Sequence, residues 1–230
     1  MITIKLLAYF KSFFLLVLLV PITLNVVANN DDEITFSKSI SSSYKALNLS
    51  TLNYYAFELA VRGHQYYKNN NQLKSNIIAI IDFDLPSSEK RLYIIDLTKN
   101  IVLHVSLVAH GKKSGLNYAS NFSNKTGSHQ SSLGFFITKE KYTGKHGLSL
   151  RLDGLEKGVN DLARKRNIVI HSAKYVSDNF VLKNKRLGRS FGCPALPLND
   201  YQEVIDYLDD EILIFIYSST RVIYPEIIKE

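Results

Sequence analysis

The segments IIAIIDF at residues 77–83, RLYIIDL at 91–97 and IVLHVSLVA at 101–109 decide the fold class of this chain. They are rich in β-branched and aromatic residues, and the polar stretches DLPSS at 84–88 and TKN at 98–100 separate them. Short runs of this kind with turn residues between them are typical of β-strands. We therefore expect three successive antiparallel strands here.

Four more short runs have the composition of strands farther along the chain. They cover residues 134–138, 149–152, 167–171 and 212–217. Between the last two, we expect Asn199 to cap a short helix that ends near Leu208. Seven short strands with little helix predict a mostly β domain, a mixed β-sandwich or an open barrel with a few short helices.

The first part of the chain predicts export. Two lysines precede an apolar run at residues 13–20, and small residues follow as far as Ala28. These are the three parts of a secretory signal peptide, so we expect residues 1–28 to be one. A membrane anchor is the alternative, but Pro21 and Asn25 within the apolar stretch favour cleavage.

The segment after the signal divides into a linker and a helical extension. Residues 29–45 contain few large apolar residues, which predicts a linker. Within an N-terminal helical extension over residues 46–75, we expect Thr51–Lys68 to form a helix with Ser50 as its N-cap. Residues 76–230 then form one catalytic domain.

Cysteine usage is the most informative feature of the composition. The chain has a single cysteine, Cys193, whereas exported proteins normally use cysteines in pairs. Such a thiol is either buried and inert, part of an intermolecular bridge, or reactive.

Charge is unevenly distributed along the chain. The formal net charge is +7, and residues 139–193 carry thirteen Lys or Arg against five Asp or Glu. This basic segment fits either an anionic partner or an ordinary solvated surface. Nucleic acid is the usual partner of such a segment, but export from the cytoplasm argues against it.

Two motifs combine a histidine with the lone cysteine. The run NIVIH at 167–171 is a strand that ends in a histidine, and GRSFGCPA at 188–195 is a glycine-rich turn around Cys193. Twenty-one residues lie between His171 and Cys193, enough for one loop to leave the strand and return. A neighbouring histidine favours the reactive thiolate by offering an ion-pair partner. The alternative is a core cysteine with a histidine that only caps its strand.

The residues around the cysteine suit the chemistry of a nucleophile. Gly192 can adopt positive φ and lets the backbone approach a substrate carbonyl. The amides of Gly192 and Cys193 are candidates for an oxyanion hole, because Pro194 has no N–H to donate. Arg189 and Ser190 are placed to hold a carboxylate or to orient the histidine.

Two upstream histidines are further candidates. His110 precedes the flexible loop GKKSG at 111–115, and it either faces a substrate or simply ends a strand. His146 lies in the loop YTGKHG at 142–147, which would overhang the site, and we assign it a binding role. The sequence contains no His or carboxylate spacing that suggests a metal site.

Together, IVIHS at 168–172 and GRSFGCPA at 188–195 resemble the active-site signature of the YkuD-type L,D-transpeptidases. More closely, the chain is similar to the murein L,D-transpeptidase catalytic domain family. Motifs at 131–136 and 142–152 extend the resemblance over residues 76–217.

The resemblance implies a β-sandwich-like catalytic domain that needs no metal or organic cofactor. Cys193 would be the nucleophile and His171 its base, and the backbone carbonyl of Ser172 would orient the imidazole. In the family, the cysteine attacks the carbonyl that joins the L-centre of a diamino acid to the terminal D-alanine of a peptidoglycan stem. D-Alanine leaves, and an amine of another stem resolves the thioester. The expected partner is a peptidoglycan stem peptide in the periplasm or cell envelope of a bacterium.

Two other functions stay open. Many family members have histidine where this chain has Phe191, and Pro194–Ala195 replace the usual residues after the cysteine. An L,D-carboxypeptidase or other cysteine hydrolase is therefore the second hypothesis. The third is a non-catalytic wall-binding module that uses the basic segment and keeps its cysteine buried. An uncleaved signal would add transient membrane contact.

Overall fold

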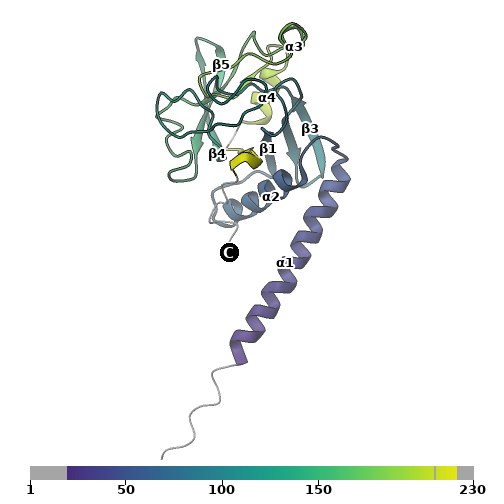
Figure 1. Ribbon diagram of the computed structural model, residues 1–230. Helices are drawn as coiled ribbons and strands as arrows, with labels where there is room; N and C mark the ends of the chain where they lie inside the picture. The colour runs from purple at the N-terminus through teal and green to yellow at the C-terminus, as the bar shows by residue number, and fades with distance from the viewer. Residues whose placement is uncertain (1–19, 210, 222–230) are drawn as a thin grey trace, which may run out of the picture. The chain divides into compact units, whose positions relative to one another are not determined.

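The computed structural model describes residues 20–209 and 211–221 (Figure 1). Its contacts divide the chain into two compact units, residues 1–41 and residues 42–230. The second unit contains the whole sheet. The boundaries expected from the sequence for linker, extension and catalytic domain stay predictions.

Helix α1 (Val20–Leu47) covers the segment 29–45, for which we expected a linker. That expectation rested on the scarcity of large apolar residues. Such a composition limits packing against a core but does not prevent hydrogen bonding between residues four apart. Most of the expected signal peptide lies outside the described residues. Within the described part of the chain, no helix has both the length and the apolar character needed to cross a membrane.

Helix α2 (Tyr54–Asn69) begins three residues later than expected. Asn53, not Ser50, is its N-cap, and the Asn53 side chain accepts a hydrogen bond of 2.8 Å from the backbone N–H of Tyr55. The helix ends in the asparagine run, as expected. Its buried face packs against β1 and β8 of the sheet (Figure 1).

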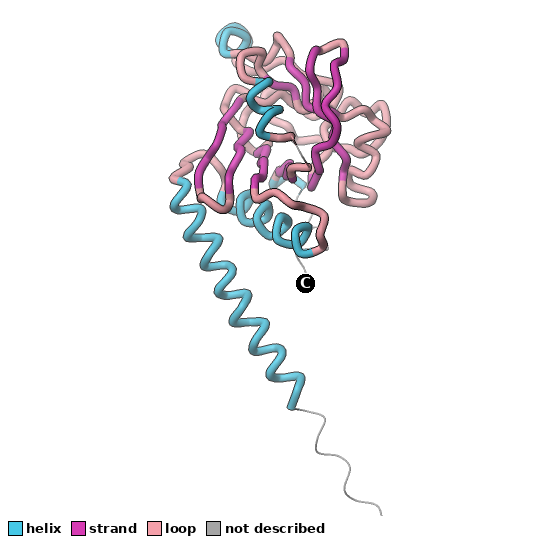
Figure 2. The backbone as a smooth tube through the Cα atoms, turned by 180° about the vertical axis from the view of Figure 1, so that it is seen from behind, coloured by secondary structure: helices cyan, strands magenta, loops and turns pink. Residues whose placement is uncertain are grey.

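Eight strands form one mixed sheet (Figure 2). They are β1 (Ile77–Asp82), β2 (Leu92–Asp96), β3 (Ile101–Ser106), β4 (Gly134–Gly144), β5 (Gly147–Gly154), β6 (Val169–Ser172), β7 (Ala195–Leu196) and β8 (Leu213–Tyr217). Their order is β3-β2-β1-β8-β4-β5-β6-β7. The antiparallel pairing expected for the first three strands is confirmed, whereas β1–β8 and β6–β7 are parallel pairs.

The two ends of this sheet meet. Ala109, just after β3, bridges Ala195 in β7, with N···O distances of 2.9 and 3.3 Å in the two directions. Since β3 and β7 are the outermost strands, this bridge nearly closes the sheet. A mostly β fold of open-barrel type is therefore confirmed.

The interior is filled by apolar side chains from both halves of the sheet. They include Ile81, Ile94, Phe136, Leu150, Ile170, Leu196 and Ile214. Helix α4 (Tyr201–Tyr207) adds Val204 and Ile205 to the same core. Cys193 is half-buried and packs against the edge of this core.

Two short elements were not expected from the sequence. Strand β7 has two residues, too few to show any periodicity. Helix α3 (Asp178–Asn184) has no buried residue and therefore no apolar stripe to detect. Helix α4 starts one residue later than expected, after Asp200, whose carboxylate accepts from Ser106 Oγ at 2.8 Å instead of capping the helix.

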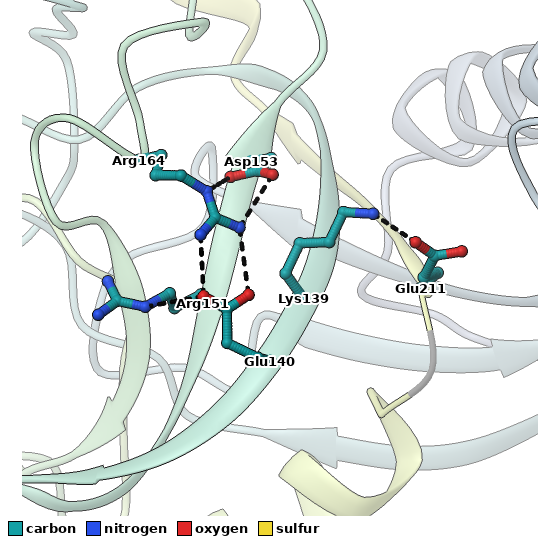
Figure 3. Close-up of polar contacts among 6 residues, drawn as sticks. All are labelled: Lys139, Glu140, Arg151, Asp153, Arg164 and Glu211. Atoms are coloured by element: carbon teal, nitrogen blue, oxygen red, sulfur yellow. Dashed lines mark hydrogen bonds and ion pairs between the residues drawn. The ribbon is translucent and has the colours of Figure 1, made fainter.

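An ion-pair network covers one face of the β4–β5 hairpin. It joins Glu140, Arg151, Asp153 and Arg164, and a separate ion pair links Lys139 to Glu211 (Figure 3). Arg164 donates to Glu140 at 2.8 Å and to Asp153 at 3.0 Å. The network spans the register shift between β4 and β5, which lies between Thr138 and Lys141. Because its members are largely exposed, salt screens their attraction, and the network mainly fixes the hairpin geometry.

Buried Glu156 predicts an unusual dependence of stability on pH. Its Oε2 accepts a 2.7 Å hydrogen bond from the Phe135 N–H, and burial raises its pKa to about 7. A carboxyl group whose pKa is higher in the folded than in the unfolded chain stabilises the fold when the pH is below its unfolded pKa. This stabilisation is lost as the pH rises through the folded pKa.

We therefore expect the free energy of unfolding to fall between about pH 5 and pH 8, by at most about 3 kcal/mol from this group. Buried Asp82, whose pKa is raised to about 6, adds to the fall. Glu156→Gln should flatten most of it, as measured by urea denaturation across pH. The exposed Glu89→Gln is the matched control and should keep the wild-type profile. An unchanged slope in Glu156→Gln would contradict the prediction.

Candidate active site

Three segments far apart in sequence converge at the closing edge of the sheet. In β6 and β7, His171 is the register partner of Ala195. Ala109 bridges Ala195, and Gly111 bridges Ser190. The end of β6, the chain after β3 and the turn at 188–195 therefore lie together, which places both sequence motifs at one site.

His171 lies in β6, and Cys193 lies two residues before the neighbouring strand β7. The backbone N–H of His171 donates to the carbonyl of Pro194 at 3.4 Å, so the histidine lies across the strand pair from the residue after the cysteine. The chain leaves β6, forms α3 and returns through the glycine-rich turn, as the spacing predicted. The thiol itself contacts the carbonyl of Asn167, with Sγ···O 3.5 Å.

The hydrogen bond of the His171 ring defines its tautomer. Nδ1 lies 2.9 Å from the carbonyl oxygen of Ser172, and a carbonyl can only accept. Nδ1 therefore carries the proton, and Nε2 keeps its lone pair. Burial, with a smaller effect of His146, lowers the pKa of His171, so the ring is neutral at neutral pH. A neutral imidazole with a free Nε2 lone pair has the form of a general base.

His146 lies on this ring. It stands at the tip of the β4–β5 hairpin, and its imidazole stacks on that of His171 with ring centroids 4.6 Å apart. Ser172 Oγ donates to the backbone carbonyl of His146 at 3.1 Å, which ties the hairpin tip to β6. The hairpin thus reaches the site as expected, and its histidine contacts the base. A contact between His146 and a substrate stays a prediction.

The thiol is in its protonated form at rest. Burial raises the pKa of Cys193, and the N–H of Val169 and the charge of Arg166 offset only part of that rise. This direction differs from the acidified thiol that we expected beside a histidine. The described residues show no hydrogen bond between Sγ and the imidazole. The site at rest therefore combines a neutral thiol with a neutral imidazole, and the thiol must lose its proton during the reaction.

The turn before the cysteine requires glycine. Gly192 has φ +127°, and a Cβ at this position would lie 2.8 Å from the carbonyl oxygen of Gln130. The expected positive φ is confirmed. Gly111 packs against it, since a Cβ on Gly111 would lie 3.0 Å from the Gly192 Cα. Close contact of two backbones holds this turn in place.

Ser190 closes the turn internally. Its Oγ donates to the carbonyl of Cys193 at 2.6 Å and accepts from the N–H of Gly192 at 3.0 Å. The side chain is buried, so it does not offer its hydroxyl to a carboxylate in this structure. The Gly192 amide is also occupied, which leaves the Cys193 amide as the stronger candidate for an oxyanion donor.

Arg189 holds a neighbouring loop. Its Nη1 donates to the carbonyl oxygens of Lys112 at 3.0 Å and Gly115 at 2.9 Å. One terminal nitrogen of the guanidinium is therefore used inside the protein. The role expected for Arg189 in holding a carboxylate stays a prediction.

His110 is fully buried. Its Nδ1 accepts from Nη2 of the buried Arg91 at 2.9 Å, and burial lowers its pKa to about 3. Its backbone carbonyl accepts from the N–H of Ser190 at 3.0 Å. A covered ring has no access to a substrate, so the structure favours the interpretation of His110 as a residue that ends its strand and supports the turn.

Two residues at the site were missed from the sequence. Ser131 Oγ accepts from Gly111 N–H at 3.0 Å and donates to the Gly192 carbonyl at 3.2 Å, which joins the two glycine backbones. Arg166 lies beside the cysteine turn and binds the loop that contains Gln130. Arg166 has no motif of its own, and Ser131 opens the motif at 131–136 without any sign of this contact, because both roles depend on loops that meet only in the folded chain.

The described residues contain no cluster of three His, Cys, Asp or Glu side chains that would hold a metal ion.

Comparison with known proteins places this geometry in a family. The sequence model of the family described as L,D-transpeptidase catalytic domain matches residues 48–217, well over half of the chain. The match includes β1 to β8 and both motifs that carry His171 and Cys193. No curated protein matches the chain.

Solved structures give only distant likenesses. An L,D-transpeptidase from Mycobacterium smegmatis is 13% identical, with 63% of this chain and 59% of that chain covered and a TM-score of 0.39. The helical cell shape determining protein Pgp2 from Campylobacter jejuni is 13% identical, with 70% and 56% covered and a TM-score of 0.40. The chain thus spans less than two thirds of the length of these structures. The match of the family model over residues 48–217 shows that the chain belongs to the L,D-transpeptidase catalytic domain family.

Proposed function

We propose that this protein is an exported peptidoglycan L,D-transpeptidase in which Cys193 is the nucleophile and His171 the general base. One observation carries the assignment within the family. The Ser172 carbonyl fixes the proton of His171 on Nδ1 at 2.9 Å, which leaves a basic Nε2 on a neutral ring across the strand pair from the cysteine turn.

The protonation states of the two groups, a neutral thiol and a neutral imidazole, suit proton transfer during the attack. The Cys193 thiol passes its proton to Nε2 of His171 as Sγ bonds to the carbonyl carbon of the stem peptide. The oxygen of the tetrahedral adduct becomes an anion, and the Cys193 N–H is the donor best placed to stabilise it. Collapse of the adduct breaks the C–N bond, and the leaving D-alanine amine takes the proton from His171. A thioester on Cys193 remains.

The second half of the reaction reverses these steps with an acceptor amine. His171 takes a proton from the attacking amine, the new amide bond forms, and the thiolate leaves and regains its proton from the imidazolium. Water in place of the amine would give hydrolysis. The acceptor therefore decides between a transpeptidase and an L,D-carboxypeptidase, the second candidate function.

The rim of the site is basic, which suits a substrate that carries carboxylates. Lys112 and Lys145 are exposed, and the pKa of both Cys193 and His171 responds to the charge of Lys145. Stem peptides carry carboxylates, and a basic rim raises their local concentration. The same feature keeps the wall-binding module as an alternative.

One incubation separates the three functions. The protein is mixed with purified muropeptides, and the products are read by mass spectrometry. Cross-linked dimers with release of D-alanine fit the transpeptidase, and shortened stems without dimers fit the carboxypeptidase. With neither product, treatment with a carbapenem decides whether Cys193 is acylated at all. An unmodified thiol in folded protein would favour the wall-binding module. Export is tested separately by fractionation of expressing cells.

Arg189→Lys tests the loop contact described above. Lysine keeps the charge but has no planar guanidinium. It therefore cannot reproduce the two hydrogen bonds that Arg189 donates to the carbonyl oxygens of Lys112 and Gly115. We expect kcat/KM on stem peptides to fall about three- to tenfold, because the loop next to the turn loses its support. The loss should persist at high salt.

The exposed Lys183→Ala is the comparison variant. It removes a charge from helix α3 and should act only through salt-screened attraction. Equal losses for both variants that vanish together at high salt would mean that Arg189 contributes only to a diffuse field.

A further inference from the structure

Arg166 is a half-buried cation that the mechanism above does not use. It stands just before β6, and Asn167, with φ +53°, follows it and turns the chain into the strand. Its guanidinium donates to the carbonyl oxygens of Ser123 and Gln130, both at 2.6 Å, and also to the hydroxyls of Ser132 and Ser128. All four acceptors are neutral and belong to one loop, residues 123–132.

No carboxylate neutralises this charge. Among the described residues, Arg166 forms no ion pair with Asp or Glu, in contrast to nearby Arg164, which binds two carboxylates. Burial lowers the pKa of Arg166, and the Cys193 thiol is the group whose negative charge acts in the opposite direction. A half-buried cation held only by neutral oxygens keeps most of its field, because solvent and counter-charges screen it little.

The guanidinium lies against the cysteine turn. A Cβ on Gly192 would be 3.3 Å from Nη2 of Arg166 and 2.8 Å from the carbonyl oxygen of Gln130, which Arg166 binds. The next residue of that loop, Ser131, donates to the Gly192 carbonyl. Arg166 therefore lies close to the turn and also holds the loop that packs on it.

Other charged or titratable groups lie on the elements around the thiol. Lys145 approaches from the β4–β5 hairpin, His171 from β6 and Tyr175 from the segment after β6. Lys145 is exposed, so salt screens its effect. Tyr175 is neutral in the relevant range, since its pKa is raised to about 12 by burial. Arg166 is thus the permanent cation beside the sulfur.

We propose that Arg166 is a positioning residue that stabilises the Cys193 thiolate as His171 removes its proton and holds loop 123–132 against the nucleophile turn. It takes no proton itself. The inference deepens the proposed function, since it concerns how the same nucleophile is activated, but it is tested on the thiol alone.

The lone cysteine makes that test direct. Alkylation of Cys193 by iodoacetamide is followed by mass across pH, and its midpoint reports the pKa of the thiol. Arg166→Gln keeps an N–H donor for the loop but removes the charge. We expect its midpoint to rise by about one pH unit, equal to about tenfold less thiolate at neutral pH. Lys165→Gln, the same charge change at the exposed neighbouring residue, should stay within about 0.2 units.

Arg166→Lys supplies the rescue. It keeps the charge, so its midpoint should return close to the wild-type value, although it supports the loop less well. An unchanged midpoint in folded Arg166→Gln would overturn the proposal. If Arg166→Gln does not fold, Arg166→Lys decides, since a midpoint raised by a full unit despite the retained charge would also overturn it.

Failure of this inference and failure of the proposed function are distinguishable. Wild-type protein that labels normally but leaves muropeptides unchanged would remove the transpeptidase assignment and leave the role of Arg166 intact. Normal muropeptide turnover together with an unshifted midpoint in Arg166→Gln would remove only the role of Arg166.

Discussion

Cys193→Ser is expected to lower turnover of stem peptides by about four or more orders of magnitude, since the proposed nucleophile is lost. The structure explains why oxygen cannot replace sulfur here. Burial already raises the pKa of the thiol, and a serine hydroxyl in the same place holds its proton far more tightly. A neutral imidazole strong enough to deprotonate the thiol is then too weak a base for the alcohol.

The fold should tolerate this change. Cys193 is half-buried, and its sulfur makes one weak contact, 3.5 Å from the Asn167 carbonyl, which a serine hydroxyl can also make. The thermal midpoint of Cys193→Ser should therefore stay close to that of the wild type. Turnover is measured as D-alanine release from muropeptides. A serine variant as active as the wild type would show that the cysteine is structural.

The sequence predicted the strands well because their signal is local. Runs such as 77–83 and 91–97 combine β-branched residues with flanking turns, and all seven expected strands begin within two residues of the observed start. The short β7 and the exposed α3 carry no such signal. Their positions are set by pairing with β6 and by the return of the chain to the site, which are tertiary effects.

The site was predictable only where a residue stands in a motif. His171, Ser172 and Cys193 were proposed because strand end, glycine turn and lone cysteine coincide, and the structure places these segments side by side. Arg166 stands three residues before β6, yet its partners lie in loop 123–132, more than thirty residues upstream. For His110, the sequence left open whether the ring faces a substrate or the residue ends its strand, and in the structure contact with Arg91 buries the ring completely.

The contacts of the buried Arg91 explain why the burial of His110 could not be predicted from the sequence. Arg91 donates to the Val108 carbonyl at 2.8 and 3.0 Å, to the Leu85 carbonyl at 2.9 Å and to His110. It is wholly enclosed and satisfied by three backbone and ring acceptors. In the sequence, Arg91 is only a charged residue at the start of an expected strand. The residues next to it do not predict that the carbonyls of Leu85 and Val108 and the ring of His110 surround it in the folded chain.

His171→Gln is expected to slow acylation by about two to four orders of magnitude, the usual contribution of a positioned general base. Glutamine is close to histidine in size, and its amide can still donate to the Ser172 carbonyl, now 2.9 Å from Nδ1. It has no basic nitrogen to receive the thiol proton. Acylation is measured as the rate of thioester formation, or of carbapenem adduct formation, by mass spectrometry.

The pH dependence identifies the mechanism of that loss. Burial lowers the pKa of His171, so the neutral base becomes available at a pH below that of a free imidazole, and the wild-type acylation rate should rise as pH passes through that lowered value. His171→Gln should lose this rise and keep only the limb set by the thiol. His104→Gln is the matched control. His104 lies on β3, its Nε2 is 3.3 Å from the carboxylate of Asp200, and it takes no part in the site. If folded His171→Gln still shows a rise of the acylation rate with the same pH midpoint, the titration belongs to another group. His171 would then be only a structural neighbour of Cys193.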